Sequence, residues 1–253
     1  MRKLLSIALI SIIQGIRAQT FWISGLVCAF FLVIAFFMRV LTIGEKEVIF
    51  RSICLSSMEI SALLLIVFGF AHSFYRERDS RLKSIYLTYV SQTQYLLGKL
   101  IGFCLLLAMY LALTSVLSSG LLFFEKALEW SFFLGGYSIF LKLCILCAFC
   151  LFFSCLFESP VLASLVTIFT YIAGELSYYT LPLINATKSC FVWGFYQFIY
   201  HLLPNVDKVD LKYQAIYCKS VSAWYVGEIT LYTFAYTAMV FALSLWIFSK
   251  KEH

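Results

Sequence analysis

Three ionisable residues interrupt long apolar stretches of the sequence: Glu59, Lys142 and Glu175. A charged side chain at the centre of a lipid bilayer costs about 2.5–3.5 kcal/mol on insertion scales, so such residues normally face a bundle interior or a partner. Each of the three is therefore an intramembrane polar candidate, and the order of the apolar stretches allows Lys142 to pair with Glu175. The alternative is an interhelical packing contact, or a side chain that reaches the membrane surface.

The sequence lacks the common motifs of nucleotide-binding proteins, zinc proteases and serine hydrolases. No G-x-x-x-x-G-K-[ST] phosphate loop is present, because Leu100 follows Gly98 and Lys99, and neither H-E-x-x-H nor G-x-S-x-G occurs. One apolar stretch contains four cysteines with spacing similar to that of zinc sites: Cys144, Cys147, Cys150 and Cys155. A single helix cannot place four sulfurs around a tetrahedral ion, so we interpret them as packing residues. We predict no catalytic residue, no metal site and no cofactor in this chain.

Apolar blocks dominate the composition. Of the 253 residues, 62% are hydrophobic and 13% are charged, whereas soluble domains are about 45–50% apolar and about 25% charged. A bilayer core about 30 Å thick needs about 20 apolar residues in a helix. We therefore predict an all-α polytopic membrane protein, with one transmembrane domain over residues 1–253. Its six expected spans lie at about 21–43, 52–74, 100–124, 132–157, 161–181 and 228–248.

Residues 1–19 precede the first expected span. Their basic start and the apolar stretch 4–13 resemble a secretory signal, but the stretch is too short to span and Arg17 follows it. Apolar residues at helical spacing favour an amphipathic helix that lies on the inner membrane surface.

Basic residues concentrate on one side of the expected bundle, at both termini and in residues 75–99. Cytoplasmic loops are enriched in Lys and Arg, so we predict that these parts face the cytoplasm and that residues 183–226 face outward. The net charge of +6 then fits attraction to the lipid bilayer, not to nucleic acid. Cys190 and Cys218 lie in the outer segment and could form a disulfide if that side is oxidising.

Residues 75–99 carry the densest mixed charge in the chain, and their second half becomes amphipathic. One interpretation is a solvated connector. The other is a docking element through which an external partner pushes on the two adjoining spans.

The stretch from Glu77 to Gly102 resembles the cytoplasmic loop of type 2 exporter-like permeases of ATP-binding-cassette (ABC) transporters. The family pattern has an acidic residue, Gly-Thr-Leu-Glu, Pro-Val-Ser-Arg and a closing Leu-Leu-Gly-Lys. The matching positions are Glu77, Leu82, Val90-Ser91 and Leu96-Leu97-Gly98-Lys99. The chain departs from the pattern at Ser80-Arg81, Tyr89 and Gln92. An N-terminal amphipathic helix, six spans and a long outer segment before the last span extend the resemblance.

The resemblance implies a half-transporter in the plasma or inner membrane of a bacterium. It would form a homo- or heterodimer with a second six-span permease and would bind two copies of an ATPase, which hold ATP and Mg²⁺. The residues implied in ATPase coupling are Glu77, Arg78, Arg81, Ser91, Gly98 and Lys99. Such an assembly exports a substrate or transmits force across the membrane, and its outer segment leaves room for an extracytoplasmic accessory protein. The alternative is a non-transporting structural or assembly membrane protein.

Overall fold

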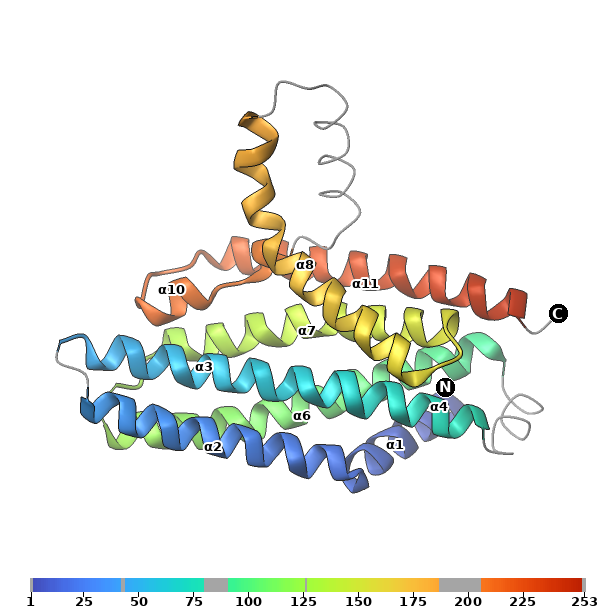
Figure 1. Cartoon of the computed structure of the whole chain (residues 1–253), viewed down its shortest axis with the longest axis horizontal. Helices are drawn as coiled ribbons and strands as arrows, with labels where there is room; N and C mark the ends of the chain where they lie inside the picture. The colour runs from blue at the N-terminus through green and yellow to red at the C-terminus, as the bar shows by residue number, and fades with distance from the viewer. Residues whose placement is uncertain (1, 42–43, 80–90, 126, 187–205, 252–253) are drawn as a thin grey trace.

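The computed structural model of the chain describes residues 2–41, 44–79, 91–125, 127–186 and 206–251, with the backbone alone at 2–4, 77–79, 177–186, 207 and 251 (Figure 1). These residues are almost wholly helical, and no strand occurs among them. The all-α class predicted from the apolar blocks is therefore confirmed for this part of the chain.

The main helices follow one another along the chain as α1 (Arg2–Arg17), α2 (Gln19–Leu41), α3 (Lys46–Leu64), α4 (Ala71–Asp79), α6 (Gln92–Phe124), α7 (Trp130–Leu156), α8 (Pro160–Ala186) and α11 (Ala223–Lys251). A π-helical turn, η1 (Leu65–Phe70), joins α3 to α4 without a break, and two short helices, η2 (Val206–Val209) and α10 (Lys212–Ile216), precede α11. Five stretches are long and apolar enough to cross a membrane, namely α2, α3 through η1 into α4, α6, α7 and α11. The chain is thus a multi-pass membrane protein.

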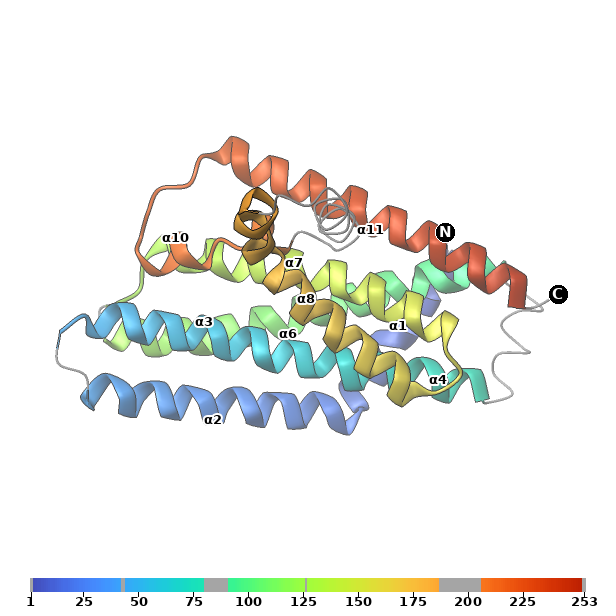
Figure 2. The same ribbon diagram turned by 45° about the horizontal axis from the view of Figure 1, so that its top comes forward.

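The bundle is built around α3 and α7, which are the most buried of these five stretches, while α2 and α11 are the least buried. α2 and α11 lie on opposite sides of the bundle in both views (Figures 1 and 2). Large side chains on α3 and α6, such as Phe50 and Phe103, are completely or almost completely buried. Apolar packing therefore fixes the central helices.

Contacts identify the two ends of the bundle. At one end, here named the Arg51 end, the Arg51 guanidinium donates to the carbonyl of Ala127 at 2.8 Å. At the other, named the Arg17 end, the Tyr75 hydroxyl donates to the carbonyl of Phe157 at 2.8 Å. Both chain termini lie toward the Arg17 end (Figure 1).

The helix α1 packs against α6 because of one glycine. A Cβ atom on Gly102 would lie 2.8 Å from the Ala8 carbonyl oxygen and 2.9 Å from the Ser11 side chain, so no larger residue fits there without a shift. Ala8 and Ser11 are buried, whereas Leu5 and Leu9 are exposed. The helix expected over residues 1–19 is thus present, with one face on the bundle and an apolar face pointing outward.

The expected fifth span takes a different form. α8 begins at the Arg17 end and reaches the middle of the bundle at Glu175. Beyond that level α8 turns away from the bundle, and it runs through Pro182 to Ala186 instead of ending at the proline (Figure 1).

The segment Val206–Ile216 packs against α7 in the other half of the bundle. Val209 and Leu211 are buried in a cluster with Leu141 of α7, near the middle of that helix. At the Arg51 end, the Ser131 hydroxyl donates to the carbonyl of Ala215 at 3.2 Å. Part of the expected outer segment 183–226 therefore lies inside the bundle, between mid-depth and the Arg51 end.

Candidate functional site

A network of ion pairs occupies the middle of the bundle, centred on the Lys142 ammonium. Lys142 Nζ lies 2.6 Å from Glu59 Oε1 and 3.2 Å from Asp210 Oδ2, and it also contacts a carboxylate oxygen of Glu175. One side chain of α7 thus binds carboxylates from α3, from α8 and from the segment between η2 and α10. Each of these elements is held to α7 by charge as well as by packing.

Lys212 adds a second ammonium. Its Nζ contacts Glu59 Oε2 and lies 4.0 Å from Asp210 Oδ2. The Tyr171 hydroxyl donates to Glu59 Oε1 at 2.7 Å, and Lys142 Nζ lies 5.3 Å from the centroid of the Tyr171 ring. Glu59 therefore accepts from three donors and is the most fully satisfied carboxylate of the network.

Burial makes these pairs costly to break. The side chains of Lys142 and Glu59 are 1% and 5% exposed, whereas that of Glu175 is 34% exposed. Removing one partner of a buried ion pair typically costs 3–5 kcal/mol, because the other charge is left uncompensated.

The charges of the network do not balance when all groups are ionised. Glu59, Glu175 and Asp210 contribute −3, and Lys142 and Lys212 contribute +2, which leaves −1. Carboxylate oxygens of the three acids lie within 4.8 Å of one another, a spacing that could hold a metal ion. The Lys142 ammonium contacts all three acids, so a lysine already supplies the positive charge that a cation would bring.

The structure brings together all three residues that stood out in the apolar stretches, including the Lys142–Glu175 pair that the helix order allowed. Sequence reasoning missed Asp210 and Lys212, because they lie in a charged segment that was expected to face solvent. The signal available was the alternation of these two charges with Val209 and Leu211, which is unusual for an exposed loop.

The residues implied in ATPase coupling divide into three groups. Glu77 and Arg78 lie in the last turns of α4, and Arg81 lies outside the described residues. Ser91 is exposed just before α6. Gly98 and Lys99 are buried, and Lys99 Nζ lies 3.3 Å from Ser73 Oγ. Lys99 therefore ties α6 to α4 and does not offer its charge at the surface.

A second polar cluster closes the Arg51 end. Beyond its bond to Ala127, Arg51 donates to the carbonyl of Ile216 at 3.2 Å, contacts the Cys218 sulfur, and lies 3.3 Å from carboxylate oxygens of Glu47 and Glu129. Although it is charged, Arg51 is only 4% exposed. It holds the end of the Val206–Ile216 segment to α3 and to the start of α7.

Cys218 is a free thiol in the described part of the chain, and desolvation raises its pKa. Cys190 lies outside the described residues, so the Cys190–Cys218 disulfide stays a prediction. The four cysteines of α7 are buried, and Cys150 Sγ lies 3.9 Å from the carbonyl oxygen of Ile66.

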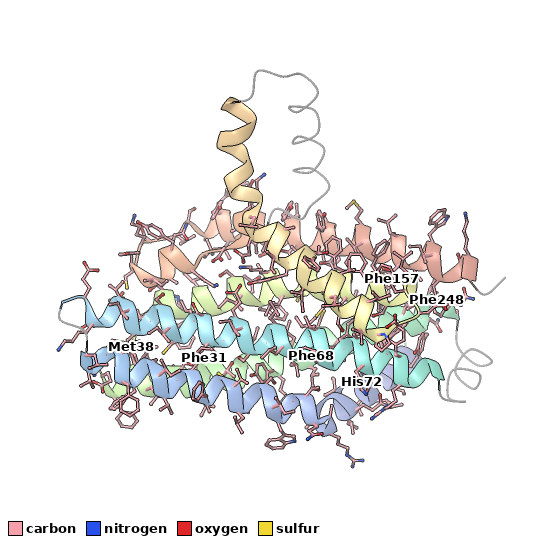
Figure 3. The ribbon with its side chains drawn as sticks, viewed as in Figure 1. Phe31, Met38, Phe68, His72, Phe157 and Phe248 are labelled. Atoms are coloured by element: carbon pink, nitrogen blue, oxygen red, sulfur yellow. The ribbon has the colours of Figure 1, made fainter. Side chains whose placement is uncertain are left out.

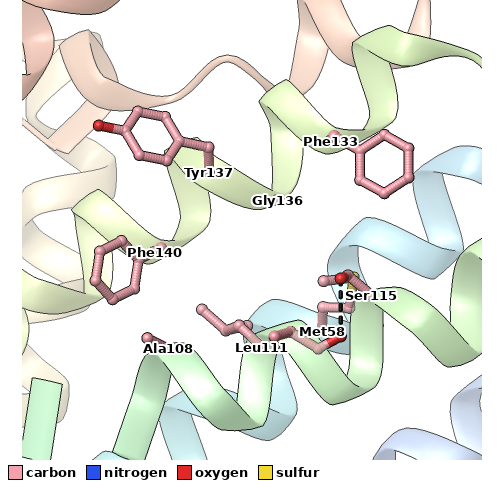
Figure 4. Close-up of a pocket in the computed structure, with 9 residues that line it drawn as sticks. Met58, Ala108, Leu111, Ser115, Phe133, Gly136, Tyr137 and Phe140 are labelled. Atoms are coloured by element: carbon pink, nitrogen blue, oxygen red, sulfur yellow. Dashed lines mark hydrogen bonds between the residues drawn. The ribbon is translucent and has the colours of Figure 1, made fainter. Parts of the chain in front are cut away.

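A small pocket of about 180 Å³ lies between α6 and α7, over Met58 (Figure 4). Its wall is largely apolar. The Ser115 hydroxyl in it donates to the carbonyl of Ala112 at 3.0 Å, and the Tyr137 hydroxyl lies within hydrogen-bond distance, 3.0 Å, of the Thr230 hydroxyl. The ion network, not this pocket, is the candidate functional site. Comparison of the chain with protein-family models and with curated proteins finds no match.

Proposed function

We propose that the chain is the membrane subunit of an ABC transporter of the type 2 exporter-like class, with a separate ATPase supplying the energy. It would act as a homo- or heterodimer to export a substrate or to transmit force across the membrane. Two features support this function: the Glu77–Gly102 resemblance, and the layout in which an amphipathic helix precedes the first span and a long segment precedes the last one.

The proposal includes six crossings, with both termini and residues 75–99 in the cytoplasm. It is supported by the way α8 enters at the Arg17 end while α11 begins at the Arg51 end, where Tyr137 contacts Thr230. The first half of α8 and the Val206–Ile216 segment together supply the sixth crossing. The basic residues of the termini and of 75–99 favour the Arg17 end as the cytoplasmic one.

The observation that carries the proposal is the set of ties at the Arg17 end. Lys99 links α6 to Ser73 of α4, and Tyr75 of α4 links to Phe157 at the end of α7. Residues 80–90 connect α4 to α6, so a push on them would move three long helices together. This is the mechanical requirement for a coupling loop.

Such a movement would change the contacts of the ion network. Glu59 lies on α3, which continues into α4, and Lys142 lies on α7. Sliding α3 against α7 would change the contacts that hold the Val206–Ile216 segment in the bundle. Buried charges resist partial displacement, so the network favours two discrete arrangements over a continuous one.

The experiment is purification of the tagged chain from its native host in mild detergent, with bound proteins identified by mass spectrometry. The wild type should retain a phosphate-loop ATPase. A Glu77→Lys/Arg78→Glu variant should retain at least tenfold less of it. The matched control is Glu45→Lys/Lys46→Glu, an exposed acid–base pair at the Arg51 end, and it should retain the ATPase as the wild type does.

Two results would refute the proposal. One is equal ATPase recovery with Glu77→Lys/Arg78→Glu and with the wild type, provided that both proteins melt at the same temperature. The other is labelling of a Ser84→Cys thiol by a membrane-impermeant reagent added to intact cells, in a chain whose Cys190 and Cys218 are replaced by serine, which would place residues 80–90 outside.

A further inference from the structure

A second cavity lies at the Arg17 end and belongs to neither the ion network nor the ties of the proposed coupling loop. It has a volume of about 400 Å³ and lies between the start of α2, the π-helical turn with α4, and the first turns of α8. Pockets for small molecules and cofactors usually span about 300–1,000 Å³. Its walls are apolar, from Phe68, Val161, Leu165 and Ile168, and polar groups from Thr20, His72 and Ser164 complete the lining.

The π-helical turn shapes this cavity. The side chain of Phe68, within the turn, is 52% exposed, and Phe68 and His72 are labelled in Figure 3. The Ser164 hydroxyl of α8 donates to the carbonyl of Val67 at 3.0 Å, which fixes α8 against the turn. Short π-helical turns are uncommon and often occur at functional sites.

The cavity also contains a polar atom without a partner. The Thr20 hydroxyl oxygen is buried, and it makes no hydrogen bond with the described residues. It would lie only 3.3 Å from a Cβ atom on Gly69, so the glycine makes room for it. A buried hydroxyl that is left unpaired is destabilising, and this one lies within the wall, against the π-helical turn.

The position of the cavity matches the boundary between headgroups and acyl chains. Thr20 lies in the first turn of the α2 span and Pro160 begins α8. Trp22, two residues after Thr20, is 69% exposed, as is typical of aromatic residues at a membrane interface. A ligand here would have its apolar part inside the bilayer and its polar part at the surface.

Two exposed arginines lie close in sequence to residues of the cavity lining. Arg17 lies one turn before Thr20, Arg76 lies one turn after His72, and both side chains are exposed. The nearby carboxylate among the described side chains is Glu158, just before α8. Two arginines against one carboxylate favour an anionic headgroup over a zwitterionic one.

We propose that this cavity binds one anionic phospholipid. An acyl chain lies along Phe68 and the first turns of α8, and the phosphate group lies at the rim between the Arg17 and Arg76 sides. The exposed His72 side chain is available to the polar part of the lipid. Such a site requires only that the bundle lies in a bilayer, so it does not depend on the ABC function.

Native mass spectrometry of the full chain in mild detergent tests the site, with phosphatidylglycerol and phosphatidylcholine of identical acyl chains as probes. The wild type should retain one phosphatidylglycerol per chain in preference to phosphatidylcholine. An Arg17→Gln/Arg76→Gln variant should lose about 30-fold in affinity for phosphatidylglycerol, because each arginine near an anionic headgroup contributes roughly fivefold. Lys46→Gln/Lys219→Gln, with both lysines exposed at the Arg51 end, should bind like the wild type.

A second pair of variants tests the site by filling the cavity with a larger side chain. Leu165→Trp should abolish retention of phosphatidylglycerol, whereas Leu162→Trp, an exposed residue of the same helix outside the cavity lining, should leave it unchanged. Equal retention of the two lipids by the wild type would overturn the site, as would equal effects of the two tryptophans. A dimer that dissociates on Leu165→Trp would also overturn it, because the cavity would then be an interface between two copies.

Discussion

Because the charges of the ion network do not balance, replacing one of its lysines and replacing one of its carboxylates should have unequal effects on stability. All groups ionised give −1, so replacing a lysine moves the network to −2, whereas replacing a carboxyl brings it to zero. We therefore expect Lys142→Met to be much more destabilising than Glu175→Gln. Methionine resembles lysine in length and is apolar, so the comparison isolates the charge.

The magnitude follows from burial. Lys142 is 1% exposed and contacts three carboxylates, so its loss should cost about 3–5 kcal/mol, the usual cost of breaking a buried pair. For soluble chains of similar length, 1 kcal/mol shifts the melting temperature by about 2–4 °C, which corresponds to a drop of roughly 6–20 °C. Glu175 is 34% exposed and contacts one ammonium of the network, so Glu175→Gln should leave the melting temperature nearly unchanged.

The chain offers its own reporter for this assay. Cys54, Cys147 and Cys150 are completely buried, so a thiol-reactive fluorescent dye reads out unfolding of the detergent-solubilised protein without added cysteines. A Lys142→Met/Glu59→Gln double variant completes a mutant cycle. Because Glu59 without Lys142 is a buried charge with one fewer counter-ion, the double variant should be more stable than the sum of the single effects predicts, by 1 kcal/mol or more.

Two results would refute this reasoning. One is a Lys142→Met protein whose melting temperature falls no further than that of Glu175→Gln, and the other is a mutant cycle that is additive within about 0.5 kcal/mol. Either result would mean that the five groups do not act as one network, and that the contacts of Lys142 do not stabilise the bundle.

Three further substitutions, two of them with a matched control, test the surrounding structure by the same thermal assay. Arg51→Gln should cost about 2–3 kcal/mol, because several buried bonds to a charged donor are lost, whereas Arg39→Gln at the same end should cost less than 1 kcal/mol, because its pair is partly exposed. Gly135→Ala should destabilise, because the added Cβ would lie 2.8 Å from a side chain of α10, and its neighbour Gly136→Ala, with nothing nearer than 3.8 Å, should not. Gly102→Val should cost about 1–3 kcal/mol by forcing α1 off α6. Equal melting temperatures within the Arg51/Arg39 pair or the Gly135/Gly136 pair would contradict the contacts described, and so would a Gly102→Val protein that melts like the wild type.

The spans could be predicted from the sequence because the bilayer sets one length scale for all of them. The first expected span, at 21–43, corresponds to Gln19–Leu41, and the fourth, at 132–157, to Trp130–Leu156. The π-helical turn could not be predicted, because residues 65–70 are as apolar as their neighbours. α8 also differs, since a proline can be accommodated inside a helix that bends, and Pro182 therefore did not mark its end.

The candidate site could be predicted only where a charge stands out from an apolar background. Glu59, Lys142 and Glu175 do so, and all three belong to the network. Asp210 and Lys212 do not, because a charged segment normally indicates exposure. Only the tertiary fold shows that their neighbours Val209 and Leu211 are buried, and that the segment carries its charges inward with them.

Two kinds of contact hold the bundle together, apolar packing and ion pairs, and they are distributed differently among its elements. α3, α6 and α7 meet through apolar side chains, and apolar packing would hold α8 and the Val206–Ile216 segment equally well, since buried ion pairs are often no more stabilising than hydrophobic replacements. Charge, in addition to packing, ties α8 and this segment to one lysine of α7 and one glutamate of α3. Such contacts require defined geometry, so a small slide of α3 against α7 weakens them all at once, while the apolar core tolerates it. If an ATPase drives that slide from the Arg17 end, the segment that it releases is the one that fills the opposite half of the bundle.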